Sequence, residues 1–219
     1  MHPTNVRLTS WALVVGSIVA TAGYASAFAA NGNGDARYAG SSWITLYTIA
    51  LFGDVIVLLG LPALVHAQSG RAPVLTRIGY AGILVPLAIL NIGEGAIEAF
   101  AKPYLATHGG IPSSDLPGLA AFEAPALVIM LVGMVCHGIA VLRARTLPRW
   151  LGVLFIVVPF LGAAGLQGAV SLLPDYLLFI GLFTVGLTQL RAARTPVRQS
   201  AASGVAELVV PTPAHGARE

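Results

Sequence analysis

Apolar residues gather in six blocks along the chain, separated by short stretches that carry most of the charge. The blocks cover residues 11–30, 43–67, 78–101, 119–142, 150–170 and 176–190. A helix needs about 20 mostly apolar residues to cross roughly 30 Å of hydrocarbon, and each block meets or approaches that length. The pattern predicts an all-α fold: a polytopic membrane bundle of six transmembrane helices over residues 1–194. Residues 195–219 turn to Pro, Ser, Ala and charge, which predicts a disordered cytoplasmic tail.

Basic residues fall almost entirely on one side of these six blocks. The outer connections hold only Arg37 and Lys102. The inner segments hold the other ten basic residues: Arg7, Arg71, Arg77, Arg143, Arg145, Arg149, Arg191, Arg194, Arg198 and Arg218. Positive charge stays on the cytoplasmic side of a membrane. We therefore expect a multi-pass protein of the cell inner membrane with both termini in the cytoplasm.

The first apolar block has a second interpretation. Ala25-Ser26-Ala27 and Ala27-Phe28-Ala29 resemble the small-residue sites at which a signal peptide is cleaved. The block is also long enough to span the bilayer. We favour an uncleaved first helix, while cleavage would leave five helices in the same orientation.

Composition supports the membrane interpretation and excludes several function classes. The chain of 219 residues is 56% hydrophobic and 10% charged, with a mean hydropathy of +0.81, whereas a soluble domain is about a quarter charged. Cys136 is the single cysteine, so no disulfide framework is expected. The basic residues form short clusters and no basic face, so we expect no nucleic-acid partner. His66 and His137 lack a close-spaced ligand motif, and we interpret them as interfacial, with no metal or cofactor expected.

Acidic residues inside the apolar blocks are the sharpest functional feature. A carboxylate within the bilayer normally faces the bundle interior and marks a site. Asp54 lies eleven residues after Trp43 and Glu94 ten residues before Tyr104, which puts both about 15–16 Å below the outer surface. Two acids at one depth on consecutive helices predict a proton-sharing pair, since like charges in a low dielectric do not both ionise cheaply. The alternative is that each acid is protonated and only bonds a neighbouring helix.

The third block carries a polar stripe with helical spacing. Asn91, Glu94, Glu98 and Lys102 are separated by three, four and four residues, so they share one face. Glu98 precedes Lys102 in the favourable order for an ion pair, which can also serve only to anchor the helix. The other candidate binding residues are Glu123 near the start of the fourth block, Tyr47, and Gln167 in the fifth block. Tyr47 lies seven residues before Asp54, on nearly the same helical face. With Ser17, Thr21 and Tyr24 of the first block, these residues predict a polar cavity in the outer half.

Three stretches of the sequence carry a resemblance. They are the basic inner turn Leu142–Trp150, the run Gly60–Leu64 and the run Ile97–Pro103. Through them the chain resembles small six-helix bacterial integral membrane proteins of unknown role. The resemblance implies fold and location only. The chain is also similar in size to membrane-bound terpene cyclases, which rely on intramembrane carboxylates, but their aromatic-flanked acidic motifs have no residue-by-residue match here.

Three functions are compatible with these features. The first is an outward-facing pocket, built on intramembrane carboxylates, that binds or moves a small solute or cation. The second is a membrane-embedded acid–base enzyme, an isomerase or a terpene-cyclase-like protein, acting on a lipophilic substrate. Only 8% of the residues are aromatic and few are expected beside the acids, which disfavours this class. The third is a non-catalytic accessory subunit of a membrane complex. The sequence leaves open whether the chain is an enzyme and whether it forms homo-oligomers.

Overall fold

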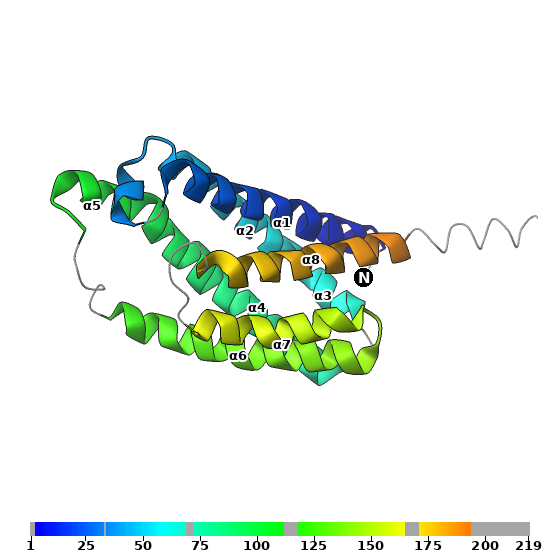
Figure 1. The fold of residues 1–219 in the computed structure, drawn as a ribbon. Coiled ribbons are helices and arrows are strands. Elements are labelled where there is room, and N and C mark those ends of the chain that lie inside the picture. The colour runs from blue at the N-terminus through cyan, green and yellow to red at the C-terminus, as the bar shows by residue number, and fades with distance from the viewer. Residues whose placement is uncertain (1–2, 33, 69–71, 112–117, 165–170, 194–219) are drawn as a thin grey trace, which may run out of the picture.

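The computed structural model describes residues 3–32, 34–68, 72–111, 118–164 and 171–193, and this part of the chain is helical (Figure 1). The elements in chain order are α1 (Pro3–Asn31), the short 3-10 helix η1 (Asp35–Ala39), α2 (Trp43–Gly60), α3 (Pro62–Ala67), α4 (Pro73–Pro86), η2 (Leu87–Glu94), η3 (Ile97–Ala101), α5 (Lys102–His108), α6 (Leu119–Ala144), α7 (Arg149–Ala163) and α8 (Leu173–Ala192). The all-α prediction is confirmed for the described residues.

Five helical stretches are long and apolar enough to cross a membrane. They are Asn5–Asn31, Trp43–Ala67, Pro73–His108, Glu123–Ala144 and Leu173–Ala192. The predicted fifth block forms α7, which is apolar but only 15 residues long within the described residues. Residues 165–170 of that block and the predicted tail 195–219 lie outside the described residues. The helices support an integral, multi-pass membrane protein, and the sixth span stays a prediction.

Small residues let α1 and α2 approach until their backbones touch. A Cβ on Gly16 would lie 2.6 Å from the backbone nitrogen of Val57, and one on Gly23 would lie 2.6 Å from that of Ala50. From the other side, Gly53 packs directly on the backbone of Ala20. Because helices in lipid gain little from burying apolar surface against each other, such close backbone packing is a main source of their association.

The stretch from α4 to α5 crosses the bundle and connects its two halves (Figure 1). Its first part packs on α6, where Gly82 and Gly133 meet backbone to backbone and Gly79 lies against His137. Its later part, η2 and η3, packs mainly on α2, and η2 keeps a smaller contact with α6. The stretch therefore leaves α6 as it proceeds toward α5, and space opens between the two beyond the glycine contact.

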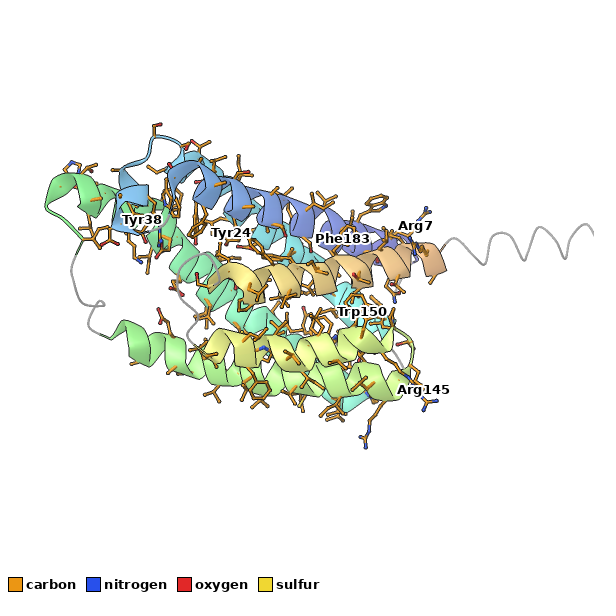
Figure 2. All side chains as sticks on the ribbon, in the orientation of Figure 1. Arg7, Tyr24, Tyr38, Arg145, Trp150 and Phe183 are labelled. Carbon is orange, nitrogen blue, oxygen red and sulfur yellow. The ribbon has the colours of Figure 1, made fainter. Side chains whose placement is uncertain are left out.

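Two labelled arginines show which residues lie at each end of the bundle. Arg7 of α1 and Arg145 after α6 lie at one end, and Tyr38 of η1 lies at the opposite end (Figure 2). Arg145 has a left-handed backbone conformation, with φ of 53°, that ends α6 and turns the chain toward α7. The indole ring of tryptophan favours the membrane–water interface, and Trp11 and Trp150 are about half exposed. Trp43 is fully buried instead.

Candidate functional site

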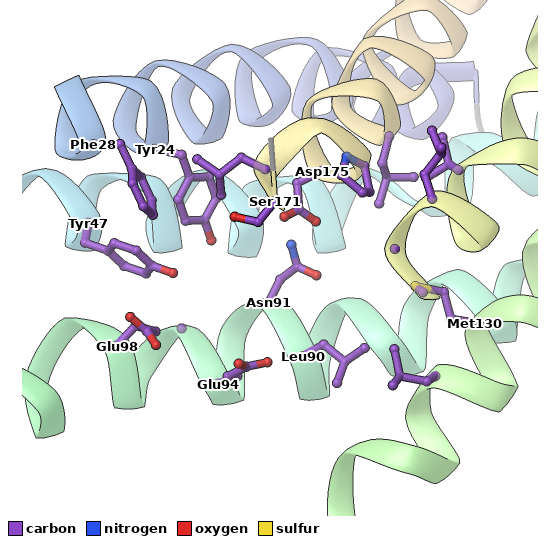
Figure 3. A pocket seen from close by; sticks show the side chains of 18 of the residues that line it. Tyr24, Phe28, Tyr47, Leu90, Asn91, Glu94, Glu98, Met130, Ser171 and Asp175 are labelled. Atoms are coloured by element: carbon purple, nitrogen blue, oxygen red, sulfur yellow. The ribbon is translucent and has the colours of Figure 1, made fainter. Parts of the chain in front are cut away.

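A cavity of about 400 Å³ lies in the space between the diverging helices (Figure 3). That volume falls within the range of roughly 300–1,000 Å³ typical of small-molecule sites. Its polar lining comes from α1, η1, α2, η2, η3, the first turn of α8 and the residues just before it: Tyr24, Arg37, Tyr47, Asn91, Glu94, Glu98, Ser171 and Asp175. Its apolar lining includes Leu127 and Met130 of α6 and Val158 of α7. Of the first-block residues predicted to line a polar cavity, Tyr24 lines this one, whereas Ser17 and Thr21 line a separate hollow formed by α1 and α8.

The polar stripe of the third block supplies one wall of this cavity. Asn91, Glu94 and Glu98 all line it, as their spacing on one helical face predicts. The helix is locally wide here, because η2 and η3 are π-helical. The wide turns follow directly on Pro86, which cannot donate a backbone hydrogen bond and crowds the preceding turn. Such π segments occur frequently at functional sites.

Glu98 is the centre of a network at the η1 end of the cavity. Its Oε2 accepts hydrogen bonds from the Tyr38 hydroxyl at 2.6 Å and from Arg37 at 3.2 Å, and Lys102 pairs with its Oε1. The predicted Glu98–Lys102 pair is thus present, within a larger cluster. Burial and the hydrogen bond to Glu98 raise the pKa of the Tyr38 hydroxyl, so this group stays a protonated donor.

The backbone of Glu98 is also held in place. In a π-helix the carbonyl of Glu98 would accept from residue 103, but that residue is Pro103, which has no N–H. The indole Nε1 of Trp43 donates to this carbonyl instead, at 2.9 Å. The buried Trp43 therefore connects α2 to η3 at the level of Glu98.

Asp175 is a site residue that the sequence prediction did not include. It lies in the first turn of α8, just before the predicted sixth block, and Pro174 occupies the helix start. Its carboxylate lines the cavity and has the Asn91 side-chain amide as its hydrogen-bonding partner (Figure 3). Asp175 is close enough to interact electrostatically with both Asp54 and Glu94. A proline followed by an acid at a helix start was the available signal, but it is also common in purely structural helix starts.

Asp54 and Glu94, the predicted proton-sharing pair, face different neighbours. Asp54 is fully buried, and its Oδ2 accepts a hydrogen bond of 2.6 Å from the Tyr24 hydroxyl of α1. Its Oδ1 is buried and has no hydrogen-bond partner among the described residues. Glu94 is half-buried and lines the cavity. Asp54 does not line it, but its partner Tyr24 does. No hydrogen bond joins Asp54 to Glu94 in the described part of the chain.

The remaining predicted binding residues are distributed around the cavity. Tyr47 lines it, with its hydroxyl directed toward the interior (Figure 3). Glu123 interacts electrostatically with Glu94 without lining the cavity, and its Oε1 is buried with no hydrogen-bond partner in the described residues. Glu123 is the fifth residue of α6, beyond the first turn where the helix dipole would stabilise it best. Gln167 lies outside the described residues.

Aromatic rings concentrate beside the acids, contrary to the expectation that few lie there. Tyr24 contacts Tyr47 edge to face at 5.1 Å between ring centroids, and Tyr47 contacts Trp43 at 5.0 Å. Phe28 and Tyr38 each pack edge-on against Trp43. The expectation rested on an overall aromatic content of 8%, which gives no information about clustering. Segments 24–28, 38 and 43–47 meet only in the folded bundle.

A second buried polar cluster lies toward the other end of the bundle. His137 of α6 is fully buried, with its Nε2 at 3.3 Å from the side-chain nitrogen of Gln68, whose oxygen accepts from Thr76 at 2.9 Å. The interfacial interpretation of His137 is therefore wrong, because this helix position faces α4 through the small Gly79. Among the described residues, no three His, Cys, Asp or Glu side chains gather closely enough to hold a metal ion.

No protein-family model, curated protein or solved structure matches the chain. The chemistry of the cavity therefore has to be inferred from its own residues. Three carboxylates, from Glu94, Glu98 and Asp175, line it together with two tyrosines. Within the described residues, the ion pairs of these carboxylates are confined to Glu98.

Proposed function

We propose that the chain is an inner-membrane protein with six spans and both termini in the cytoplasm, whose outward-facing cavity binds or moves a small cationic solute. The orientation is supported by the ten-to-two distribution of basic residues in the sequence. Arg7 and Arg145 at one end of the bundle, with the cavity near the η1 end, are consistent with it. In this orientation the cavity opens toward the outside.

One observation carries the binding proposal: Glu94 and Asp175 line the same cavity without a basic partner in the described residues. Burying a carboxylate without compensation is costly, so such a group is normally paired, protonated or bound to a cation. A ligand that brings positive charge between Glu94 and Asp175 compensates both. Asp54 acts as a positioning residue, since it holds the Tyr24 ring that lines the cavity.

Binding can be tested on the purified full chain in detergent. The unfolding midpoint is followed while sodium, potassium, ethylguanidinium or choline chloride is added at constant ionic strength. We expect at least one cation to raise the midpoint of the wild type, and Glu94→Gln or Asp175→Asn to abolish that rise. Asp35→Asn is the matched control, because Asp35 is an exposed acid on η1. Equal responses in all four proteins would refute the cation site.

Orientation needs a separate experiment. Cys136 is the single cysteine, so Cys136→Ser gives a cysteine-free background. In this background, Asp35→Cys should react with a membrane-impermeant maleimide added to intact cells, and Arg145→Cys should react only after the cells are opened. The opposite labelling pattern would place the cavity on the cytoplasmic side.

The aromatic cluster beside the acids favours a second candidate function. Glu94 lines the cavity together with Tyr24 and Tyr47. A carboxylic acid beside aromatic rings is the combination needed to protonate a lipophilic substrate and stabilise a carbocation. Analysis of products from membranes incubated with isoprenoid substrates tests this. Turnover that is lost in Glu94→Gln would favour the enzyme over the binding protein.

A further inference from the structure

Arg37 reaches from η1 into the end of the cavity and is enclosed there by aromatic rings. Its guanidinium carbon lies 4.6 Å from the ring centroid of Tyr38 and 5.2 Å from those of Phe28 and Trp43. Its Nη2 lies 3.2 Å from Oε2 of Glu98. We call Phe28, Tyr38, Trp43 and Glu98 the Arg37 cage. The cage combines three aromatic rings and a carboxylate, which are the groups that bind an organic cation, and the cation it holds is the guanidinium of Arg37.

The chemistry of the cage selects a particular class of cation. Aromatic faces within about 6 Å attract a weakly hydrated, delocalised cation such as guanidinium. A small alkali cation keeps its hydration shell more tightly and gains less from such rings.

Arg37 is not an ideal occupant of its own cage. Its side chain is 20% exposed, yet its Nε is buried and finds no hydrogen-bond partner among the described residues. The guanidinium is attached to a short 3-10 helix, which limits how it can turn within the cage. A free guanidinium can choose its orientation, so it can satisfy donors that Arg37 leaves unsatisfied.

The same cavity continues from Arg37 to carboxylates that have no such occupant. Arg37, Glu94 and Asp175 all line it. Glu98 is ion-paired with Arg37 and Lys102, whereas within the described part of the chain neither Glu94 nor Asp175 has an ion pair. A cationic ligand that reaches Glu94 therefore meets Arg37 as a competing positive charge in the same space.

We propose that Arg37 is a tethered competitor at the outer end of the cavity, and that the ligand is an organic cation of the guanidinium or alkylammonium class that displaces it. This inference rests on the proposed cation-binding function and assigns its ligand class and its regulation. Removing the Arg37 side chain leaves the three rings and the Arg37 contact on Oε2 of Glu98 available to the ligand, while Lys102 stays paired with Oε1. Binding should then become tighter, which is the opposite of what loss of an ordinary ligand-contacting residue produces.

The test measures binding of ethylguanidinium chloride to the purified full chain by titration calorimetry, with sodium and potassium chloride at the same ionic strength as comparisons. We expect ethylguanidinium to bind the wild type and the alkali cations to have no effect. Arg37→Ala should lower the Kd for ethylguanidinium about tenfold, equivalent to about 1.4 kcal/mol. Arg143→Ala, which removes an exposed arginine at the end of α6, is the matched control and should leave the Kd unchanged.

Each result separates the inference from the proposed function. An unchanged or weaker affinity in Arg37→Ala overturns the tethered competitor. If Arg37→Ala does not fold, Arg37→Lys takes its place, because it retains the charge but loses the planar guanidinium. Arg37→Lys should also bind ethylguanidinium more tightly than the wild type does. Equal affinity of Arg37→Lys and the wild type overturns the inference. Binding of sodium or potassium alone, lost in Glu94→Gln, overturns the organic ligand while leaving the cation site intact. If no cation binds in a Glu94-dependent manner, the proposed function itself fails, and this inference with it.

Discussion

The hydrogen bond between Tyr24 and Asp54 should be the strongest single polar contribution to the pairing of α1 with α2. The donor and acceptor oxygens are 2.6 Å apart, and the exposed fractions are 4% for Tyr24 and 0% for Asp54. Hydrogen bonds to charged groups contribute about 1.5–3 kcal/mol in proteins. Measured couplings between membrane helices are smaller, about 0.6 kcal/mol on average with a maximum of about 1.7. Because both side chains are enclosed, we expect a coupling near that maximum, about 1.5 kcal/mol.

A double-mutant cycle measures this coupling. Tyr24→Phe leaves both oxygens of Asp54 without a partner, since Oδ1 already lacks one in the described residues, and should reduce the free energy of unfolding by about 1–3 kcal/mol. Asp54→Leu should also be destabilising. The double variant should cost little more than the worse single variant, because neither buried group is then left unsatisfied.

The assay is reversible unfolding in dodecyl sulfate, followed by circular dichroism. Tyr104→Phe is the control for loss of a tyrosine hydroxyl, since Tyr104 is 62% exposed, and it should leave the free energy of unfolding within about 0.5 kcal/mol of the wild type. Independent sites add within roughly 0.3–0.5 kcal/mol. Additivity of the two cycle variants within that margin would show that the bond contributes nothing to stability.

Other predictions concern packing and processing. Gly133→Leu should lower the unfolding free energy by at least about 1–3 kcal/mol, because the new side chain would meet the backbone of Gly82 on α4. Gly93→Leu is its control, with the nearest atom 3.6 Å from the added Cβ; equal costs would contradict the close crossing. Gln68→Leu should cost about 1–3 kcal/mol in the same titration, since two buried side chains lose a partner. Mass spectrometry of the purified protein should find peptides that precede Ala25, because α1 supplies the cavity with a tyrosine; their absence would indicate cleavage.

The sequence was sufficient to predict the helices because the bilayer makes a strong demand on it. Apolar block 43–67 matches the span Trp43–Ala67, and block 119–142 matches α6 to within two residues. The predicted third block, 78–101, was ended at the charged residues Arg77 and Lys102. The observed helical stretch is longer, from Pro73 to His108, and includes both of them. A lysine near a helix end can be accommodated by an ion pair, as Lys102 is by Glu98.

Spacing along one helix was likewise enough to place Asn91, Glu94 and Glu98 on one cavity wall. Relations between helices were harder to predict. Counting residues gives the depth of Asp54 but not the direction in which it points around α2. That direction is determined by Gly53, whose close contact with Ala20 brings the neighbouring Asp54 against α1 and Tyr24. Such a contact depends on two helices at once, so neither segment predicts it alone.

Asp175 illustrates why depth itself can mislead. Asp175 directly precedes the predicted apolar block 176–190, so the sequence places it at a membrane boundary. An acid is common at such a position and does not indicate a site. In the structure α8 begins well short of the end of the bundle at which α5 lies (Figure 1), so the first turn of α8 is beside the cavity. Asp175 thereby faces Asn91 and comes within electrostatic reach of Asp54 and Glu94. Asp175 lines the cavity and interacts with both acids. Asp175→Asn should therefore weaken ligand binding more than Asp54→Asn does. A larger effect of Asp54→Asn would show that Asp54 is the more important acid for binding.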